Sequence, residues 1–254
     1  MNIYTGFLRY PLNEVKVTKL RFCFVRTLCS EVVHSFPSIP EIISEQNKNE
    51  CMKRIQSIRI SPRELSENNR KRAAVLIPLC VIDKQLSLLY TLRRENLKRH
   101  RGQVSFPGGI EDATDSSLVD TALRETEEEL GISKESVKVW GSGSIIVGNE
   151  FCVLPVLGYL GPLNLNQLKP NPDEVEMAFS IPLKHFCSKE NCRYTQFRCS
   201  DSKGYVLPVY MNGRCRVWGI TALITHIVLT SLLPNHYKHK LEYIKPMVLH
   251  PPVL

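Results

Sequence analysis

The sequence lacks several features that would place the protein in a familiar structural class. It has no run of about eighteen uncharged apolar residues, so no membrane-spanning helix is expected. It has no Cys-x-x-Cys motif and no internal repeat, and its nine cysteines are odd in number and unevenly spaced, which argues against a disulfide framework. The seven histidines are also scattered, so a structural zinc site is not expected. We therefore expect reduced thiols, mostly in a core, and an intracellular compartment.

The composition is ordinary for a soluble globular protein, with 43% hydrophobic and 23% charged residues. A length of 254 residues is enough for one sizeable domain and an extension. The net charge of +8 favours an anionic partner. A nucleotide-like substrate, a nucleic acid and an anionic membrane surface would all fit that charge.

The densest group of carboxylates in this basic chain lies in the segment Phe106–Ile132. Its second half predicts a helix that ends before Gly131. On a wheel of about 100° per residue, Glu125, Glu128 and Glu129 share one face, and Glu127 falls on the opposite, solvent side. The side expected to pack on a core is formed by Val119, Ala122, Leu123, Thr126 and Leu130.

Three carboxylates on one face need a compensating charge, because like charges three and four residues apart destabilise a helix. Arg124 can pair with Glu128, but one arginine does not neutralise three carboxylates. A hard divalent cation such as Mg²⁺ takes oxygen ligands and keeps waters and phosphates in its shell. The cluster therefore favours metal-assisted phosphate chemistry over the alternative, a solvated acidic face.

The wider spacing resembles the Nudix box, the loop-helix signature of Nudix hydrolases. The box reads Gly, five residues, Glu, seven residues, then Arg-Glu-apolar-any-Glu-Glu-any-Gly-apolar, and here Gly109 and Arg124–Ile132 follow it. Thr126 departs from the pattern by replacing the usual aliphatic residue. Asp115 stands in the place of the early Glu, and Arg124 follows Gly109 by fifteen residues rather than fourteen. This variant of the first half resembles the coenzyme A branch of the family.

A second signature just upstream resembles that of the coenzyme A diphosphatases, in particular the mitochondrial type. It reads Leu-Leu-Thr-x-Arg-Ser, Arg, Gly and Phe-Pro-Gly-Gly with three residues in each gap, and the spacing holds here. Tyr90, Arg94 and Lys98 replace the second Leu, the Ser and the Arg. Basic side chains suit the diphosphate and 3′-phosphate of coenzyme A, and the glycines let backbone approach them. Arg94, Arg99 and Arg101 are each interpreted as solvated loop residues. The residues that the resemblance assigns to substrate binding are Arg93, Lys98, Gly102, Phe106, Pro107, Gly108 and Gly109.

The resemblance implies an α/β class and the Nudix fold, an α/β/α sandwich with a mixed β-sheet. It implies hydrolysis of the diphosphate of coenzyme A or its thioesters, giving 3′,5′-ADP and 4′-phosphopantetheine or its acyl derivative. Glu125, Glu128 and Glu129 would hold Mg²⁺ or Mn²⁺ with the Gly109 carbonyl, and Arg124 would orient the carboxylates. Glu125 is the first choice for the general base. Glu174, in a distal loop, is the reserve.

The chain divides into four expected segments: a basic extension at 1–40, a helix and linker at 41–69, the hydrolase domain at 70–235 and a tail at 236–254. Within the domain the apolar run 73–82 predicts a strand buried on both faces, followed by a hairpin partner. Apolar patterning predicts a helix from Val217 to about Leu233, ended by Pro234. Trp218 on that helix is interpreted as a core residue, with stacking on an adenine as the alternative. The other expected strands are 86–92, 137–147, 151–160, 174–181, 194–197 and 205–210, and a helix with Ser44 as its cap is expected at 40–56.

The basic extension resembles a mitochondrial transit peptide, and a plain disordered tail is the alternative. Together with the family resemblance it predicts the mitochondrial matrix as the location. The expected partner is a small-molecule substrate, coenzyme A or its thioesters, with no nucleic acid and no membrane span; a monomer and a homodimer both remain open. Two other functions stay open: a Nudix enzyme acting on ADP-ribose or NADH, and a non-catalytic module that binds nucleotide or RNA.

Overall fold

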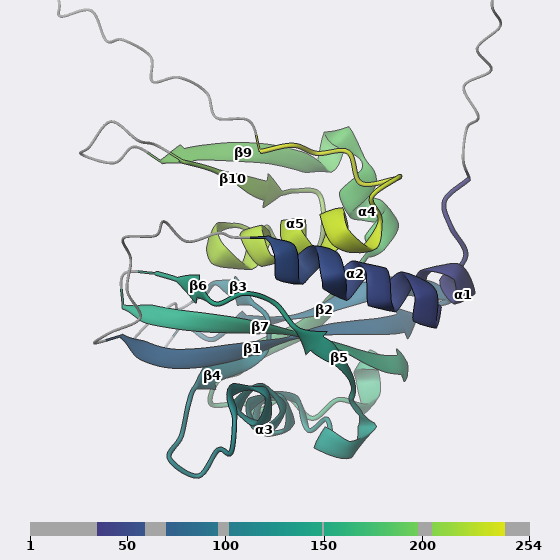
Figure 1. The fold of residues 1–254 in the computed structure, drawn as a ribbon. Helices are drawn as coiled ribbons and strands as arrows, with labels where there is room; N and C mark the ends of the chain where they lie inside the picture. Colours follow the sequence, from purple (N-terminus) through teal and green to yellow (C-terminus); the bar gives the residue numbers. More distant parts are fainter. Residues whose placement is uncertain (1–34, 59–69, 96–101, 149, 198–204, 242–254) are drawn as a thin grey trace, which may run out of the picture. The chain divides into compact units, whose positions relative to one another are not determined.

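The apolar run predicted as a buried strand is the central strand of a mixed sheet (Figure 1). The computed structural model describes residues 35–58, 70–95, 102–148, 150–197 and 205–241. The predictions for residues 1–34 and for Lys98, Arg99 and Arg101 lie outside these ranges. The elements in chain order are α1 (Ile39–Ile42), α2 (Glu45–Ser57), β1 (Lys71–Ile82), β2 (Gln85–Arg93), β3 (Val104–Ser105), β4 (Gly108–Ile110), α3 (Leu118–Leu130), η1 (Lys134–Ser136), β5 (Lys138–Ser142), β6 (Ile146–Val147), β7 (Phe151–Pro162), η2 (Leu165–Gln167), β8 (Val175–Pro182), α4 (Leu183–Cys187), η3 (Lys189–Asn191), β9 (Cys192–Phe197), β10 (Tyr205–Tyr210) and α5 (Gly219–Leu232).

Strand pairing in the sheet follows from short turns and one crossover. The turn at Asp83 and Lys84, where both residues have positive φ, joins β1 to β2 as the predicted antiparallel hairpin. β1 pairs in parallel with β7 on its other side, and all other pairs in the sheet are antiparallel. The strand order is β3-β2-β1-β7-β5, with β4 on β1, β6 on β7 and β8 on β2. β9 and β10 form the separate late hairpin that the sequence predicted.

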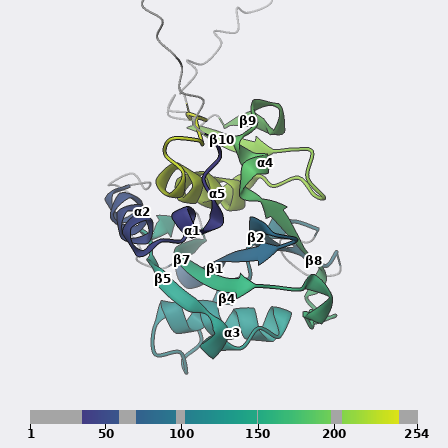
Figure 2. The ribbon, with the colours of Figure 1, turned by 90° about the vertical axis from the view of Figure 1, so that its right-hand side faces the viewer.

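The two faces of β1 belong to two different apolar clusters. Ala74, Leu76 and Cys80 pack with α3 on one face, whereas Ile77 and Leu79 pack with α2 and α5 on the other. Figures 1 and 2 show the resulting layers, with α3 on one side of the sheet and α2 and α5 on the other. Alternating residues of a strand point to opposite faces, so an unbroken apolar run is what a strand covered on both faces requires. The expected α/β/α sandwich is confirmed.

Helix α3 begins and ends at residues suited to those positions. The Ser117 side chain accepts a hydrogen bond from the Asp120 amide, and Gly131 ends the helix in the left-handed conformation at φ 68°. Of the predicted core stripe, Ala122, Thr126 and Leu130 are buried. Val119 and Leu123 are half-buried, and Leu118 and Thr121 are buried in addition. Thr126 tolerates burial because its hydroxyl donates to the Ala122 carbonyl oxygen at 2.6 Å.

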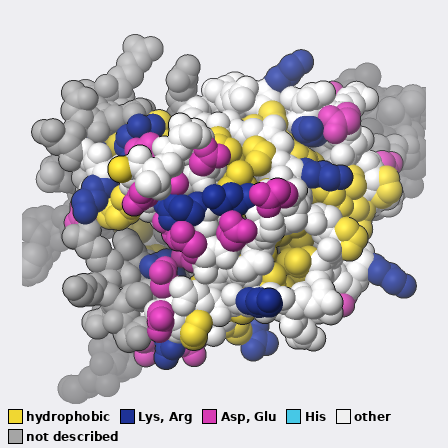
Figure 3. Space-filling view, turned by 90° about the horizontal axis from the view of Figure 1, so that it is seen from below, with side chains coloured by type: hydrophobic (Ala, Val, Ile, Leu, Met, Phe, Trp, Pro, Cys, Tyr) yellow, Lys and Arg dark blue, Asp and Glu magenta, His cyan; other side chains and the backbone are white. Residues whose placement is uncertain are grey.

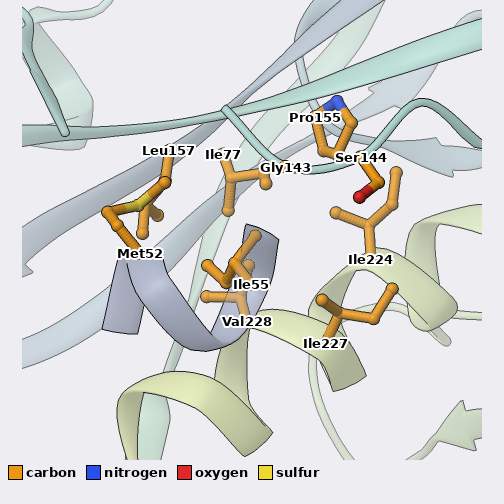
Figure 4. Close-up of a pocket in the computed structure, with 10 residues that line it drawn as sticks. All are labelled: Met52, Ile55, Ile77, Gly143, Ser144, Pro155, Leu157, Ile224, Ile227 and Val228. Carbon is orange, nitrogen blue, oxygen red and sulfur yellow. The ribbon is translucent and has the colours of Figure 1, made fainter. Parts of the chain in front are cut away.

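The helices before β1 pack with the predicted hydrolase domain. Ser44 caps α2 as predicted, accepting a hydrogen bond from the Asn47 amide, and a second short helix, α1, precedes it. Met52 and Ile55 of α2 face α5 and the sheet across an apolar cavity of about 10 Å³ (Figure 4), which is no larger than one water requires. At the other end of the chain, Tyr237 is 3% exposed and joins the same core.

Helix α5 has the predicted apolar character, but its first turn differs from expectation. Val217 is fully buried, whereas Trp218 is 39% exposed, so the interpretation of Trp218 as a core residue is wrong. Trp218 stands at the N-cap with extended backbone, and its side chain therefore does not follow the buried stripe of the helix.

The described helices and cysteines can be compared with the expectations from the sequence. Within the described ranges, no helix is long and apolar enough to cross a membrane. The described cysteines are all free thiols, and four of the six are buried: Cys51, Cys80, Cys152 and Cys192.

Replacing Gly131 by Ala should destabilise the protein by about 1 kcal/mol, because an L side chain is strained at a positive φ. An added Cβ would also lie 3.0 Å from the Lys169 Cβ. Gly131→Asn is the matched control, since Asn meets the same neighbour but tolerates this backbone conformation. Thermal unfolding should rank the melting temperatures as wild type, then Asn, then Ala. Equal melting temperatures for all three proteins would contradict this account of the helix end.

The buried His226 should make stability depend on pH. Burial, followed by the charge of His239, lowers the pKa of His226 from 6.5 to about 4. Below pH 6.5 the unfolded chain therefore binds a proton that the folded chain does not, and stability falls as the pH falls toward 4. Urea unfolding between these pH values should show a steeper loss for wild type than for His226→Gln. Parallel losses would mean that this histidine is not kept neutral by the fold.

Candidate active site

A close contact between the glycine turn, which is Gly108 and Gly109 at the start of β4, and α3 positions the acidic face of the helix. Gly109 lies in β4, and a Cβ built on it would stand 2.4 Å from the Glu125 carboxyl carbon. On Gly108, at φ 153°, a Cβ would stand 2.3 Å from the Ala74 carbonyl oxygen. Two consecutive residues without side chains therefore let β4 lie between β1 and the Glu125 carboxylate.

Arg124 bonds three carboxylates at once. Its Nε and Nη2 donate to the two oxygens of Asp115 at 2.8 and 3.0 Å, and its Nη1 donates to Glu125 and Glu128, each at 3.0 Å. Nη2 also reaches the Ile110 carbonyl oxygen at 3.2 Å. Hydrogen bonding to Arg124 holds the pKa of Asp115 well below its usual range. Such a bidentate pair fixes the plane of the guanidinium, and Arg124 in turn fixes the two glutamates.

Glu129 is the deepest carboxylate of the face. Its side chain is only 2% exposed, and Oε1 accepts a hydrogen bond from Arg93 Nη1 at 3.1 Å. The second oxygen, Oε2, is buried and has no hydrogen-bond partner among the described residues. A buried carboxylate oxygen without a partner is costly, so its presence needs an explanation. A bound cation or substrate group at this oxygen would supply one.

Burial and neighbouring carboxylates favour the protonated forms of Glu129 and Glu125. Burial raises the pKa of Glu129 to about 8 against the opposing effect of Arg93, and the charges of Glu125 and Glu174 raise it further. Burial also raises the pKa of Glu125, partly offset by Arg124. Glu174 acts on both glutamates, so the distal-loop carboxylate considered from the sequence lies within electrostatic range of the helix.

The oxygen-only donor set fits Mg²⁺ or Mn²⁺, but the carboxylates do not surround one point. Among the described residues, no three acidic, histidine or cysteine side chains form such a group. Glu125 and Glu128 bond Arg124 instead, while Glu129 bonds Arg93. Figure 3 shows basic and acidic side chains gathered side by side on the face that α3 covers. The unpartnered Glu129 oxygen is the observation that favours a hard cation here.

The residues predicted to bind substrate fall into two groups. Gly102 is exposed and adopts a left-handed turn at φ 64°, and Gly108 and Gly109 are half-buried in β4 beside β1. Phe106 and Pro107 are instead buried. The Phe106 ring stacks on Tyr90 with 4.7 Å between centroids, so this side chain serves the core and is not available to a ligand.

Two residues have structural roles that we did not predict from the sequence. Arg94, interpreted as a solvated loop residue, bonds the Pro172 carbonyl oxygen and pairs with Glu176 at 3.6 Å. Its amide also donates to the Glu174 carbonyl oxygen at 3.0 Å, so it ties the end of β2 to the loop that carries Glu174. Asp115 is the main partner of Arg124. The unusual Asp in the first half of the box was the signal for that role.

Gly109→Ala should reduce hydrolysis about tenfold or more, which corresponds to about 1.4 kcal/mol in the barrier, because the new methyl group displaces the Glu125 carboxylate. The φ of Gly109 is not positive, so unfolding should change little. Gly161→Ala is the control, because it should change stability and leave activity unchanged. Gly161 has φ 73° and no atom within 4 Å of an added Cβ, so that variant should lose about 1 kcal/mol of stability but no activity. Full activity in Gly109→Ala would contradict the proposed contact.

Comparison with known proteins gives this geometry a family. The family model described as NUDIX domain matches residues 70–195. The chain is 44% identical over 171 residues to "Mitochondrial coenzyme A diphosphatase NUDT8" of Mus musculus, covering 66% of this chain and 81% of the mouse protein. It is 40% identical over 207 residues to the protein of the same name in Homo sapiens, covering 80% and 85%. "Nudix hydrolase 3" of Caenorhabditis elegans is 36% identical over 215 residues, covering 76% and 88%.

The family model covers the segment that contains Arg93, Gly108, Gly109 and the acidic helix α3. The resemblance noted from the spacing of Gly109 and Arg124–Ile132 is therefore confirmed. The chain belongs to the Nudix hydrolase family.

Proposed function

We propose that this Nudix hydrolase cleaves the diphosphate bond of coenzyme A and acyl-coenzyme A. Water adds to one phosphorus, the bridging P–O bond breaks, and the products are 3′,5′-ADP and 4′-phosphopantetheine or its acyl derivative. The observation that carries the proposal is the contact between Arg93 and Glu129. It joins the segment that resembles the coenzyme A signature to the acidic helix of the hydrolase. The names of the mouse and human relatives point to the same substrate.

Arg93 and Arg124 are suited to different tasks. Arg124 is saturated by carboxylates and a carbonyl oxygen, so it orients Glu125 and Glu128. Arg93 has one described carboxylate partner and a side chain that is 23% exposed, which leaves guanidinium N–H groups for a phosphate oxygen. A diphosphate held by Arg93 would thus lie beside the acidic face of α3.

Glu125, Glu128 and Glu129 are the residues that would hold Mg²⁺ or Mn²⁺, assisted by the Gly109 carbonyl oxygen. The cation, when bound, neutralises diphosphate charge and lowers the pKa of an attacking water. Glu125 is the proposed general base. Its side chain is half-buried, its carboxylate lies close to Gly109 and its pKa is raised. Glu174 is the second choice, on the basis of its electrostatic effect on both glutamates.

We further propose that the protein works in the mitochondrial matrix. The mouse and human relatives are named as mitochondrial. The basic composition of residues 1–40, which resembles a transit peptide, agrees with that location. Fusion of residues 1–40 to a fluorescent protein tests whether this segment directs import into mitochondria. Cytosolic fluorescence would refute the proposed location.

Glu129→Gln should abolish Mg²⁺- or Mn²⁺-dependent hydrolysis and leave the fold intact. The amide keeps the shape and an acceptor for Arg93, so stability should not fall, but it cannot ionise to become an anionic ligand for the cation. Glu127→Gln is the matched control, because Glu127 is exposed on the same helix. Steady-state kinetics and thermal unfolding measure the two effects. Near-wild-type turnover by Glu129→Gln would refute the assignment.

The substrate is tested by comparing initial rates on coenzyme A, ADP-ribose and NADH at equal concentration. The proposal predicts the highest kcat/KM for coenzyme A. Faster cleavage of ADP-ribose or NADH would mean that the protein is a Nudix diphosphatase but that its substrate is another nucleoside diphosphate derivative. Binding to RNA without hydrolysis of any of the three would favour a non-catalytic module, whose affinity would fall steeply with salt.

A further inference from the structure

An exposed aromatic and a basic side chain stand together just before α5. Trp218 is 39% exposed, and the guanidinium carbon of Arg216 lies 5.8 Å from the centre of its ring system. Arg216 forms no ion pair with any carboxylate in the described part of the chain. An arginine over an indole face is a favourable cation–π arrangement that leaves the guanidinium edge free to donate hydrogen bonds.

This pair lies on the α5 face of the sheet, opposite α3, and contacts through β3 link it to the end of β2 that carries Arg93. The Thr221 hydroxyl, one helical turn after Trp218, donates to the Val104 carbonyl oxygen of β3 at 3.0 Å. Val104 pairs with Leu92, and the next residue of β2 is Arg93, which contacts Glu129. Figure 1 shows β3 beside α5 at this end. These contacts connect the first turn of α5, through β3 and β2, to Glu129 on the other side of the sheet.

A second contact fixes the segment before Trp218 to the same strands. Arg214 Nε lies 2.8 Å from the sulfur of Met177, and Met177 pairs with Leu92 across β8 and β2. The segment 214–218 thus follows the edge where β2 ends with Arg93. Two arginines and an exposed indole would suit a planar, anionic group attached to a diphosphate bound at Arg93.

We propose that Trp218 and Arg216 form the subsite for the 3′-phosphoadenosine end of the substrate. The adenine stacks on the exposed indole face, and the Arg216 guanidinium donates hydrogen bonds to the 3′-phosphate. The pantetheine end then extends away from α5. This inference rests on the proposed function, because it takes its ligand from that reaction. Trp218 and Arg216 determine substrate specificity, and the chemistry stays with α3.

Binding without turnover tests the subsite independently of activity. The protein has two tryptophans, Trp140 and Trp218, so quenching can be assigned by substitution. Adenosine 3′,5′-bisphosphate should quench tryptophan fluorescence saturably in wild type and in Trp140→Phe. It should not do so in Trp218→Phe. Quenching that persists in Trp218→Phe, or fails in wild type, overturns the proposal.

Kinetics separate the roles of the two side chains. Trp218→Ala should raise KM for coenzyme A about tenfold with little change in kcat, because a lost stacking contact weakens substrate binding. Trp218→Phe should recover most of this loss, and Ile220→Ala is the control for an exposed apolar residue in the same turn, at 42% exposure. Arg216→Gln should raise KM for coenzyme A but not for dephospho-coenzyme A, which lacks the 3′-phosphate.

The outcomes distinguish the two proposals. If wild type does not cleave coenzyme A but adenosine 3′,5′-bisphosphate still quenches Trp218, the proposed function fails and the subsite stands. If wild type cleaves coenzyme A with the same KM in Trp218→Phe, Trp218→Ala and Arg216→Gln, the subsite is wrong and the function stands. Equal KM increases for coenzyme A and dephospho-coenzyme A in Arg216→Gln would refute the role given to the 3′-phosphate.

Discussion

The burial of Glu129 against Arg93 is the interaction on which the site depends. Glu129 is 2% exposed, and a carboxyl group buried to this depth would be costly without the hydrogen bond from Arg93. The pair also joins the end of β2 to the last turn of α3. Any group that binds Glu129 Oε2 therefore contacts the residue that connects α3 to β2. The strands β3 and β8 pair with β2 next to this point.

The remaining acidic side chains are organised by two different means. Gly109 makes space for Glu125 by having no side chain, and Arg124 holds Glu125 and Glu128 through direct hydrogen bonds. Asp115 anchors Arg124 from the loop before the helix. Shape and charge thus cooperate to hold a face of like charges that α3 alone would not favour.

The sequence predicted the direction of side chains on α3 well, but not their depth. Helical periodicity correctly placed Glu127 in solvent and Ala122 in the core, because a 3.6-residue repeat fixes angles around the axis. It could not show that Glu129 lies deeper than Glu128, since depth depends on how β4 packs against the helix. The sequence also did not show the depth of two aromatic residues: Phe106 is buried, whereas Trp218, interpreted as a core residue, is 39% exposed. Aromatic character does not reveal whether a residue stacks on Tyr90 or stands outside a helix N-cap.

Product identification by mass spectrometry, after coenzyme A is incubated with the protein and Mg²⁺ or Mn²⁺, tests the central claim most directly. The arrangement of Arg93, Arg124 and the three glutamates predicts 3′,5′-ADP and 4′-phosphopantetheine in equal amounts, formed only when the divalent cation is present. Release of dephospho-coenzyme A, or intact coenzyme A after prolonged incubation with active cation, would contradict it.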